Sequence, residues 1–312
     1  MKGTSMHDET GLVHIVDDVA ALDPRPDQLV MLHALDGFLD AGAAARLAAA
    51  QLSGGAEGPV IASFDLDQLY DYRARRPAML FVTDHYEEYS TPRLLVRLLH
   101  DETGGPYLLL SGPEPDVAWE RFIAAVRLVI DRFGVTSVVA MGGVPMAVPH
   151  TRPVTWTVHG TRPDELPEHT SMFSGQLRVP SSAQSLLEFR LGEWGYQALG
   201  FVAHVPHYLA QMEFPSAAAA LLRAVSDATG LKFDLTDVDG AAQASLAQIT
   251  AQLEDNDEVA EVVRALEAQY DAFTRAAEAS LLTGEGPLPT GEELGAEFER
   301  FLAGLDRPDD RP

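Results

Sequence analysis

The sequence contains no cysteine. This absence excludes disulfide bonds, thiolate nucleophiles and cysteine-ligated zinc or iron–sulfur clusters, and it is typical of proteins in a reducing compartment. No apolar run approaches the roughly 18 residues that span a bilayer. The polar residues 1–11 lack the apolar core of a secretory signal. We therefore expect a cytoplasmic protein without a membrane-spanning segment.

Basic residues are scarce, and the few present are nearly all arginines. The chain has 22 Lys and Arg against 47 Asp and Glu, which gives a net charge of −25. Only Lys2 and Lys232 are lysines. A field of this sign repels nucleic acids and anionic membranes, so neither is expected as a partner. With 312 residues, 46% of them hydrophobic, the chain can still bury a large core.

The standard catalytic signatures are also missing. The sequence has no phosphate-binding loop, no dinucleotide-binding glycine motif, no Gly-x-Ser-x-Gly elbow and no His-Glu-x-x-His zinc motif. We therefore expect no cofactor and no metal. Whether the protein is an enzyme stays open at this point, with the absences favouring a non-catalytic protein.

The segment from residue 28 to about residue 230 alternates short apolar runs with helical patterns, which predicts an α/β fold. The expected strands are 28–35, 59–63, 78–82, 92–99, 107–110, 136–141, 154–158 and 198–205, and the expected helices include 41–52, 183–194 and one from Pro215 to Gly230. We place the core domain at 12–233.

The region after residue 233 has a different character. Two helical apolar stripes flank the polar stretch 254–258, which predicts a helical hairpin over 234–282. Residues 283–312 read as a linker, a short helix with Leu294, Phe298 and Phe301 on one face, and a disordered end. Such a short helix needs a surface to dock on.

Polar side chains follow most of the expected strands. The tripeptide Val-Pro-His occurs twice, at 148–150 and 205–207, each time after a β-rich run. Because ligands of open α/β sheets bind at the carboxyl ends of strands, we expect a pocket there. Asp84, His85 and Glu87 follow the strand expected at 78–82 and belong to the same predicted rim. The candidate pocket residues are Asp36, Asp40, Asp65, Asp67, His150, Arg152, His204, His207 and Tyr208.

Each candidate has a structural alternative. Asp40 suits a helix cap better than a catalyst, and Asp65 with Asp67 suits a solvated turn better than half of a metal site. His150 beside Arg152 could bind an oxyanion or act as a general acid or base, or it could simply bond the backbone. His204 and His207 are separated by a proline and do not form a helical metal pair.

Five blocks of the sequence together resemble one family. Residues 36–42 (DGFLDAG) look like the Gly-aromatic-x-Asp-Ala-Gly signature of the PAC2 family, the proteasome assembly chaperone 2-like proteins. Residues 64–73, 110–116, 143–153 and 204–211 are similar to its actinobacterial branch. The likeness covers roughly residues 12–230, and the helical region after it resembles the domain appended in that branch.

The resemblance implies a three-layer α/β/α core similar to nucleoside phosphorylases, and a homo-oligomer with a trimer as the first expectation. Eukaryotic relatives are binding proteins that help to assemble proteasome rings. We therefore expect a non-catalytic, homo-oligomeric protein-binding or assembly protein, with a partner contacting the C-terminal helices. The alternative is an enzyme or sensor that binds a small anionic ligand around His150, Arg152 and His207.

Overall fold

The computed structural model describes residues 10–16, 28–54, 58–167, 176–254 and 257–283. Its strands are β1 (Val13–Ile15), β2 (Val30–Asp36), β3 (Val60–Phe64), β4 (Met79–Val82), β5 (His85–Tyr89), β6 (Leu95–His100), β7 (Pro106–Pro113), β8 (Ser137–Met146), β9 (Trp156–Gly160) and β10 (Gln197–Pro206). Its α-helices are α1 (Ala44–Ser53), α2 (Trp119–Phe133), α3 (Ala183–Glu193), α4 (Pro215–Thr229), α5 (Thr236–Glu254) and α6 (Asp257–Thr283).

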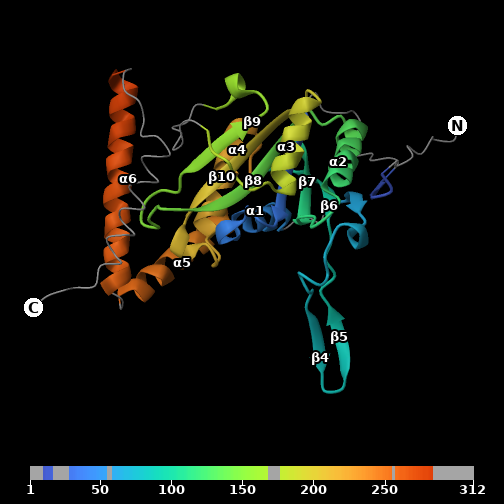
Figure 1. The fold of residues 1–312 in the computed structure, drawn as a ribbon, viewed down its shortest axis with the longest axis horizontal. Helices are drawn as coiled ribbons and strands as arrows, with labels where there is room; N and C mark the ends of the chain where they lie inside the picture. The colour runs from blue at the N-terminus through green and yellow to red at the C-terminus, as the bar shows by residue number, and fades with distance from the viewer. Residues whose placement is uncertain (1–9, 17–27, 55–57, 168–175, 255–256, 284–312) are drawn as a thin grey trace, which may run out of the picture.

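Eight of these strands form one mixed sheet in the order β1-β3-β6-β7-β2-β8-β10-β9 (Figure 1). The neighbours β7, β2, β8 and β10 are parallel, whereas β9 is antiparallel to β10. Strand β3 also points in their direction, because it is antiparallel to β6, which is antiparallel to β7. Five strands therefore deliver their carboxyl ends to the same edge of the sheet.

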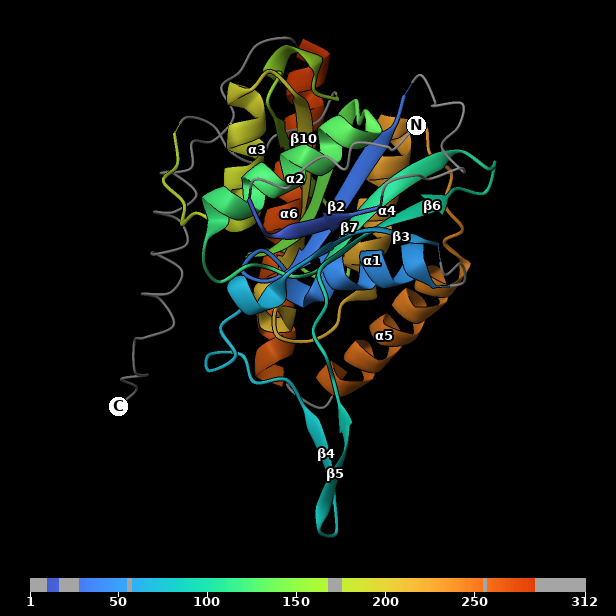
Figure 2. The ribbon, with the colours of Figure 1, turned by 90° about the vertical axis from the view of Figure 1, so that its right-hand side faces the viewer.

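Helices cover both faces of the sheet, as expected for the α/β class. On one face α1, α4 and α5 bury a cluster that includes Ala48, Leu222 and Phe201. On the other face α2 and α3 bury a cluster that includes Phe122, Val126 and Leu187 (Figures 1 and 2). The two faces follow the alternation of strand residues, since consecutive side chains of β2 enter opposite clusters. The predicted α/β fold is confirmed; the specific likeness to nucleoside phosphorylases stays a prediction.

Helix α1 starts later than the pattern predicted. The helix expected at 41–52 begins at Ala44, because Gly42 and Ala43 have φ values of 68° and 52° and form a left-handed turn. Gly42 suits this turn since it has no Cβ, and a Cβ there would lie 3.0 Å from the Cβ of Phe214. The chain needs this turn to swing from the end of β2 onto the α1 face.

The strand expected at 78–82 does not join the central sheet, and this part of the predicted rim is wrong. Strands β4 and β5 pair only with each other and form a hairpin that extends away from the body (Figures 1 and 2). We call residues 79–89 the arm. Asp84 and His85 lie at its turn, far from the carboxyl edge. The apolar run from Met79 to Val82 resembles a buried strand in sequence, yet these residues are exposed or half-buried.

The two C-terminal helices contact different parts of the core. Helix α5 packs on α4, where the carboxylate of Asp239 lies 2.6 Å from the guanidinium of Arg223. Helix α6 lies beside the loop between β8 and β9, and the hydroxyl of Tyr270 donates a hydrogen bond to the carbonyl of Pro153. The helices expected within 234–282 are present. The linker, docking helix and end expected for 283–312 lie outside the described residues apart from Thr283.

Candidate functional site

The two Val-Pro-His corners are neighbours at the carboxyl edge of the sheet. The hydroxyl of Tyr208 accepts a hydrogen bond of 3.0 Å from the backbone N–H of His150 and lies 2.7 Å from its Nδ1. Burial lowers the pKa of His150 and raises the pKa of Tyr208 to about 12. The His150 imidazole is therefore hydrogen-bonded to the Tyr208 phenol, and this pair links the loop after β8 to the end of β10.

Arg152 is engaged within the chain. Its guanidinium forms two bonds of 2.8 Å with the carboxylate of Asp271 and one of 3.1 Å with that of Glu267, both on α6. The hydrogen bond that Arg152 donates to the Asp271 carboxylate is the main reason why the pKa of Arg152 rises. The alternative hypothesis assigned the positive charge of Arg152 to the binding of an anionic ligand. In this structure the same charge pairs with α6 and holds that helix against the core.

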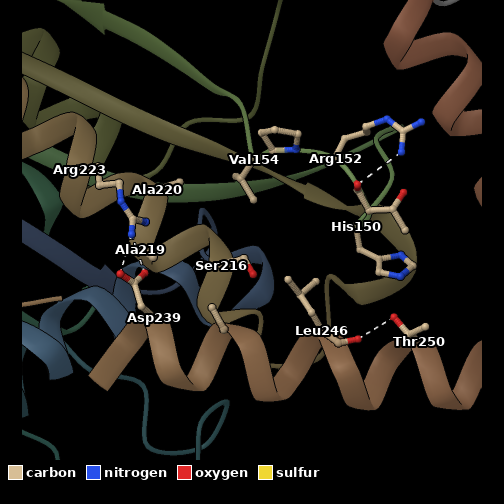
Figure 3. A pocket seen from close by; sticks show the side chains of 13 residues that line it. His150, Arg152, Val154, Ser216, Ala219, Ala220, Arg223, Asp239, Leu246 and Thr250 are labelled. Atoms are coloured by element: carbon tan, nitrogen blue, oxygen red, sulfur yellow. Dashed lines mark hydrogen bonds and ion pairs between the residues drawn. The ribbon is translucent and has the colours of Figure 1, made fainter. Parts of the chain in front are cut away.

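A cavity of about 630 Å³ opens beside these residues, between the β8–β9 loop and helices α4 and α5 (Figure 3). His150, Arg152 and Val154 line one side, and Ser216, Arg223 and Leu246 belong to its lining from α4 and α5. The Ser216 hydroxyl is buried without a hydrogen-bond partner among the described residues. Arg223 is paired with Asp239, as Figure 3 shows.

The two histidines at the end of β10, His204 and His207, have different surroundings. His204 is 1% exposed, and its ring nitrogens lie 2.8 Å from the hydroxyls of Thr155 and Thr157. Burial lowers its pKa to about 4, so it is a neutral core residue. His207 is exposed, and its ring stands edge-on to that of Tyr208 at 5.4 Å.

The acidic candidates after β2 and β3 do not gather with the histidines. Asp65 caps a short turn by accepting a 3.1 Å bond from the backbone of Asp67, and Asp67 accepts a bond from Tyr72. Both carboxylates are exposed, which is the solvated turn that the sequence offered as an alternative. Asp36 is also exposed and borders a shallow pocket with Arg46.

Asp40 lies in a second and larger cavity, which we call the groove. The groove has a volume of about 960 Å³ and a mainly apolar lining from the loop after β2, the end of β8, the N-terminal half of α3 and the segment before it. The position of the groove follows from the topology of the sheet. The chain passes from β2 to α1 on one face of the sheet, whereas from the neighbouring strand β8 it passes through β9 to α3 on the other face. Ligands of open α/β sheets bind at such a switch point.

Asp40 acts partly as the predicted cap. One carboxylate oxygen accepts a 2.6 Å bond from the backbone N–H of Ala45, in the first turn of α1. Burial raises the pKa of Asp40 to about 6, although its backbone hydrogen bonds act in the opposite direction. A partly buried carboxyl with a raised pKa at a switch point is a candidate binding group as well as a cap.

Sequence reasoning missed the other polar groups of the groove. His159 of β9 and Glu188 of α3 both line it, and the Glu188 carboxylate lies 2.8 Å from Nδ1 of His159. These two residues belong to different elements, and no motif links them. Their meeting depends on Gly200 of β10, because a Cβ there would lie 2.2 Å from the imidazole Cε1 of His159. The ring needs that space.

In the described ranges no cluster of three or more His, Asp and Glu side chains could hold a metal ion. None of the helices found there has the length and apolar character needed to cross a membrane.

Comparison with known proteins gives the family. The sequence profile described as the PAC2 family matches residues 34–253, which is most of the chain. The chain belongs to the PAC2 family. Among curated proteins none matches it.

Several solved structures are similar to this PAC2 protein. A Mycobacterium tuberculosis protein of unknown function is 45% identical, with a TM-score of 0.81, and the match covers 85% of this chain and 93% of that one. One of unknown function from Corynebacterium glutamicum is 33% identical, with a TM-score of 0.79 and coverages of 84% and 97%. A proteasome-assembly chaperone homologue from M. tuberculosis is 28% identical, with a TM-score of 0.66 and coverages of 76% and 100%.

The PAC2 signature at 36–42 has a structural role in this chain. A Cβ on Gly37 would lie 2.0 Å from a carboxylate oxygen of Glu114, so only glycine fits there. The buried Glu114 carboxylate accepts bonds from the backbone N–H groups of Phe38 and Ala183, at 2.9 and 2.7 Å. This carboxylate therefore fixes both the loop after β2 and the start of α3, which are two walls of the groove.

Proposed function

We propose that this PAC2 protein is a non-catalytic, homo-oligomeric protein of the cytoplasm that binds other proteins in an assembly-chaperone-like role, with a trimer as the expected state. Family membership and the similarity to a proteasome-assembly chaperone homologue support the role. The observation that carries the oligomeric part is the arm.

The arm carries several large apolar side chains and is almost wholly exposed. Met79, Phe81, Tyr86 and Tyr89 are 52%, 56%, 66% and 46% exposed, and Phe81 and Tyr86 pack only edge-on against each other at 5.1 Å. An isolated two-stranded hairpin is marginally stable in water. Exposed apolar surface of this kind is typical of a protein-binding surface. The arm therefore favours a partner chain.

Charge favours a second copy as that partner. The turn side of the arm carries Asp84, Glu87 and Glu88, whereas the exposed Arg73 and Arg76 lie just before the arm in the chain. An acidic arm of one copy can thus face the basic segment of the next. A head-to-tail contact of this kind generates a ring when its rotation closes, which is consistent with a trimer.

Native mass spectrometry tests the oligomer. We expect the wild-type mass to be a multiple of the 33.7 kDa chain, and the double variant Phe81→Ser/Tyr86→Ser to shift to the monomer. Phe189→Ser is the matched control, because Phe189 is 60% exposed but lies on α3, outside the arm. A monomeric wild type, or an arm variant with the wild-type mass, would reject this part of the proposal.

We further propose that the protein bound in this assembly role contacts the C-terminal helices. The apolar face predicted for residues 290–305 supports this proposal. The test adds the purified protein to separated proteasome subunits from the same source and follows particle formation on a sizing column. We expect faster formation with the full chain and no acceleration after deletion of 284–312. An unchanged rate with the full chain would reject the assembly role.

A further inference from the structure

Two carboxylates line the groove, and an ionised carboxylate only accepts hydrogen bonds. Asp40 and Glu188 supply carboxylates, and Nδ1 of His159 lies 2.9 Å from the Glu188 carboxylate. The side-chain amide of Gln184, which could donate, is already bonded to the carbonyl of Met141. None of the described lining residues is a lysine or an arginine. Gln211 also lines the groove and its amide can donate, but the acidic groups of the lining are carboxylates, so a ligand that carries donors is favoured.

One row of residues crosses four neighbouring strands of the sheet and reaches the groove at Ala140 and His159. His33, Ala140, Gly200 and His159 occupy one row across β2, β8, β10 and β9. They share the α3 face of the sheet, where Ala140 lines the groove. His33 is 1% exposed, and its Nδ1 has no hydrogen-bond partner among the described residues. Unpaired polar atoms in native structures are often partners of a ligand or an unplaced water.

The remaining lining is apolar and partly open. Phe38, Leu177 and Val179 are 60%, 71% and 67% exposed at the rim, and Val144, Pro145 and Val202 lie among the other lining residues. A volume of about 960 Å³ falls within the range of small-molecule sites, which is roughly 300–1,000 Å³. The site therefore has an apolar wall for the body of a molecule and an acceptor cluster for its head.

We propose that the groove is a binding site for a small organic ammonium ion, that is, an apolar molecule with a protonated amine, and that it discriminates against anions. The amine would lie between the carboxylates of Asp40 and Glu188, with the apolar body along the rim formed by Phe38, Leu177 and Val179. This site differs from the one around His150 and Arg152 in place and in sign of charge. It is also independent of the assembly role.

Electrostatics supports a cation over an anion. The chain carries −25 overall, so its field attracts cations and repels anions before contact. Asp40 is partly buried, and burial raises its pKa. A bound ammonium ion would offset the cost of holding that carboxylate away from water. An anion would instead face two carboxylates with no cationic side chain among the described lining residues.

Three probes with one apolar body separate these cases: 4-phenylbutylamine, 4-phenylbutanol and 4-phenylbutyrate, titrated by calorimetry at pH 7.5. We expect the amine to bind about tenfold more tightly than the alcohol, since a hydrogen bond to a charged group contributes enough for that ratio. The carboxylate should bind more weakly than the alcohol. Equal binding of amine and carboxylate, or no binding of the amine, would overturn the proposal.

Two charge-removing variants and a control locate the site. Asp40→Asn and Glu188→Gln keep the side-chain shapes, and each should reduce the preference for the amine over the alcohol several-fold while leaving alcohol binding intact. Retained alcohol binding shows that the variant groove is folded. Glu193→Gln is the control, because Glu193 is on the same helix but pairs with Arg190 instead. An unchanged amine preference in both test variants would overturn the assignment, as would tighter binding of a lysine-centred pentapeptide than of the amine.

Discussion

The core and the arm contain the same types of aromatic residue, but the core buries them and the arm exposes them to water. In the core, Phe122 is fully buried and its ring lies 5.3 Å from that of Phe64. In the arm, Phe81 is 56% exposed and its ring neighbour is Tyr86, which is 66% exposed. Burial of apolar surface stabilises a fold only where that surface leaves water within the chain. The core therefore accounts for the stability of the single chain, and the arm leaves its apolar surface in water.

The largest expected effect is in the core. Phe122→Ala removes a fully buried ring and should lower the free energy of unfolding by about 3–5 kcal/mol, because close packing leaves a cavity. Urea unfolding followed by circular dichroism measures it. A loss below about 1 kcal/mol would mean that the α2 face is loosely packed and would break the contrast with the arm.

The next effect concerns pH and the buried histidines. The pKa of His204 is lowered from 6.5 to about 4 by burial, so below pH 6.5 the unfolded chain binds a proton that the folded chain does not. Stability is complete above pH 6.5 and falls towards pH 4, by on the order of 3 kcal/mol for this residue.

Two other groups contribute to the same pH profile. His33, whose pKa is also lowered to about 4, acts in the same direction. Asp40, raised to about 6, acts in the opposite direction, since its contribution is present at low pH and is lost as pH rises through 6. Urea unfolding from pH 7 to 4.5, with NMR titration of the His204 ring, checks the balance. A His204 ring that protonates near pH 6.5 would contradict it.

An intermediate effect is expected where the loop after β2 meets α3. Glu114→Ala removes a buried carboxylate that two backbone N–H groups bond, and it should cost about 2 kcal/mol. Hydrogen exchange should rise first at Phe38 and Ala183. If exchange at these two amides is unchanged, Glu114 does not hold the walls of the groove.

The smallest effect is expected in the arm. Phe81→Ala should change the unfolding free energy of the dilute monomer by less than about 0.5 kcal/mol, because the ring is already largely in water. At higher concentration the same variant should lose the part of the stability that depends on association. Thermal unfolding over a hundredfold range of concentration separates these contributions. A large loss in the dilute monomer would place the arm in the fold of the single chain.

Much of the fold was predictable because its signals are local. The alternation of apolar runs and helical stripes predicted the strands and helices of the sheet, and Ser182 caps α3 where its sequence position predicted a helix start. The strand at 78–82 was misplaced because an apolar run has the same composition in a buried strand and in an exposed hairpin. Sequence pattern reports which residues avoid water, and it does not report what covers them.

The candidate site residues also divide into those with local contacts, which the sequence could predict, and those with distant contacts, which it could not. Capping by Asp40 and Asp65 could be read from position in the chain, since a cap is a contact between residues a few places apart. The engagement of Arg152 by Asp271 spans more than a hundred residues and left no local signal. The pairing of His159 with Glu188 over Gly200 likewise needed the registers of β9 and β10 and the position of α3.

The sequence by itself determined the class of fold, the acidic field, the absence of thiol chemistry and the family signature, because these follow from composition and short-range order. Tertiary structure alone decided which side chains meet: it placed His204 in the core, tied Arg152 to α6, opened a groove at the switch point of the sheet and left the arm without a core. The physical reason is that contacts between distant residues depend on strand order and register, which many different local patterns can share.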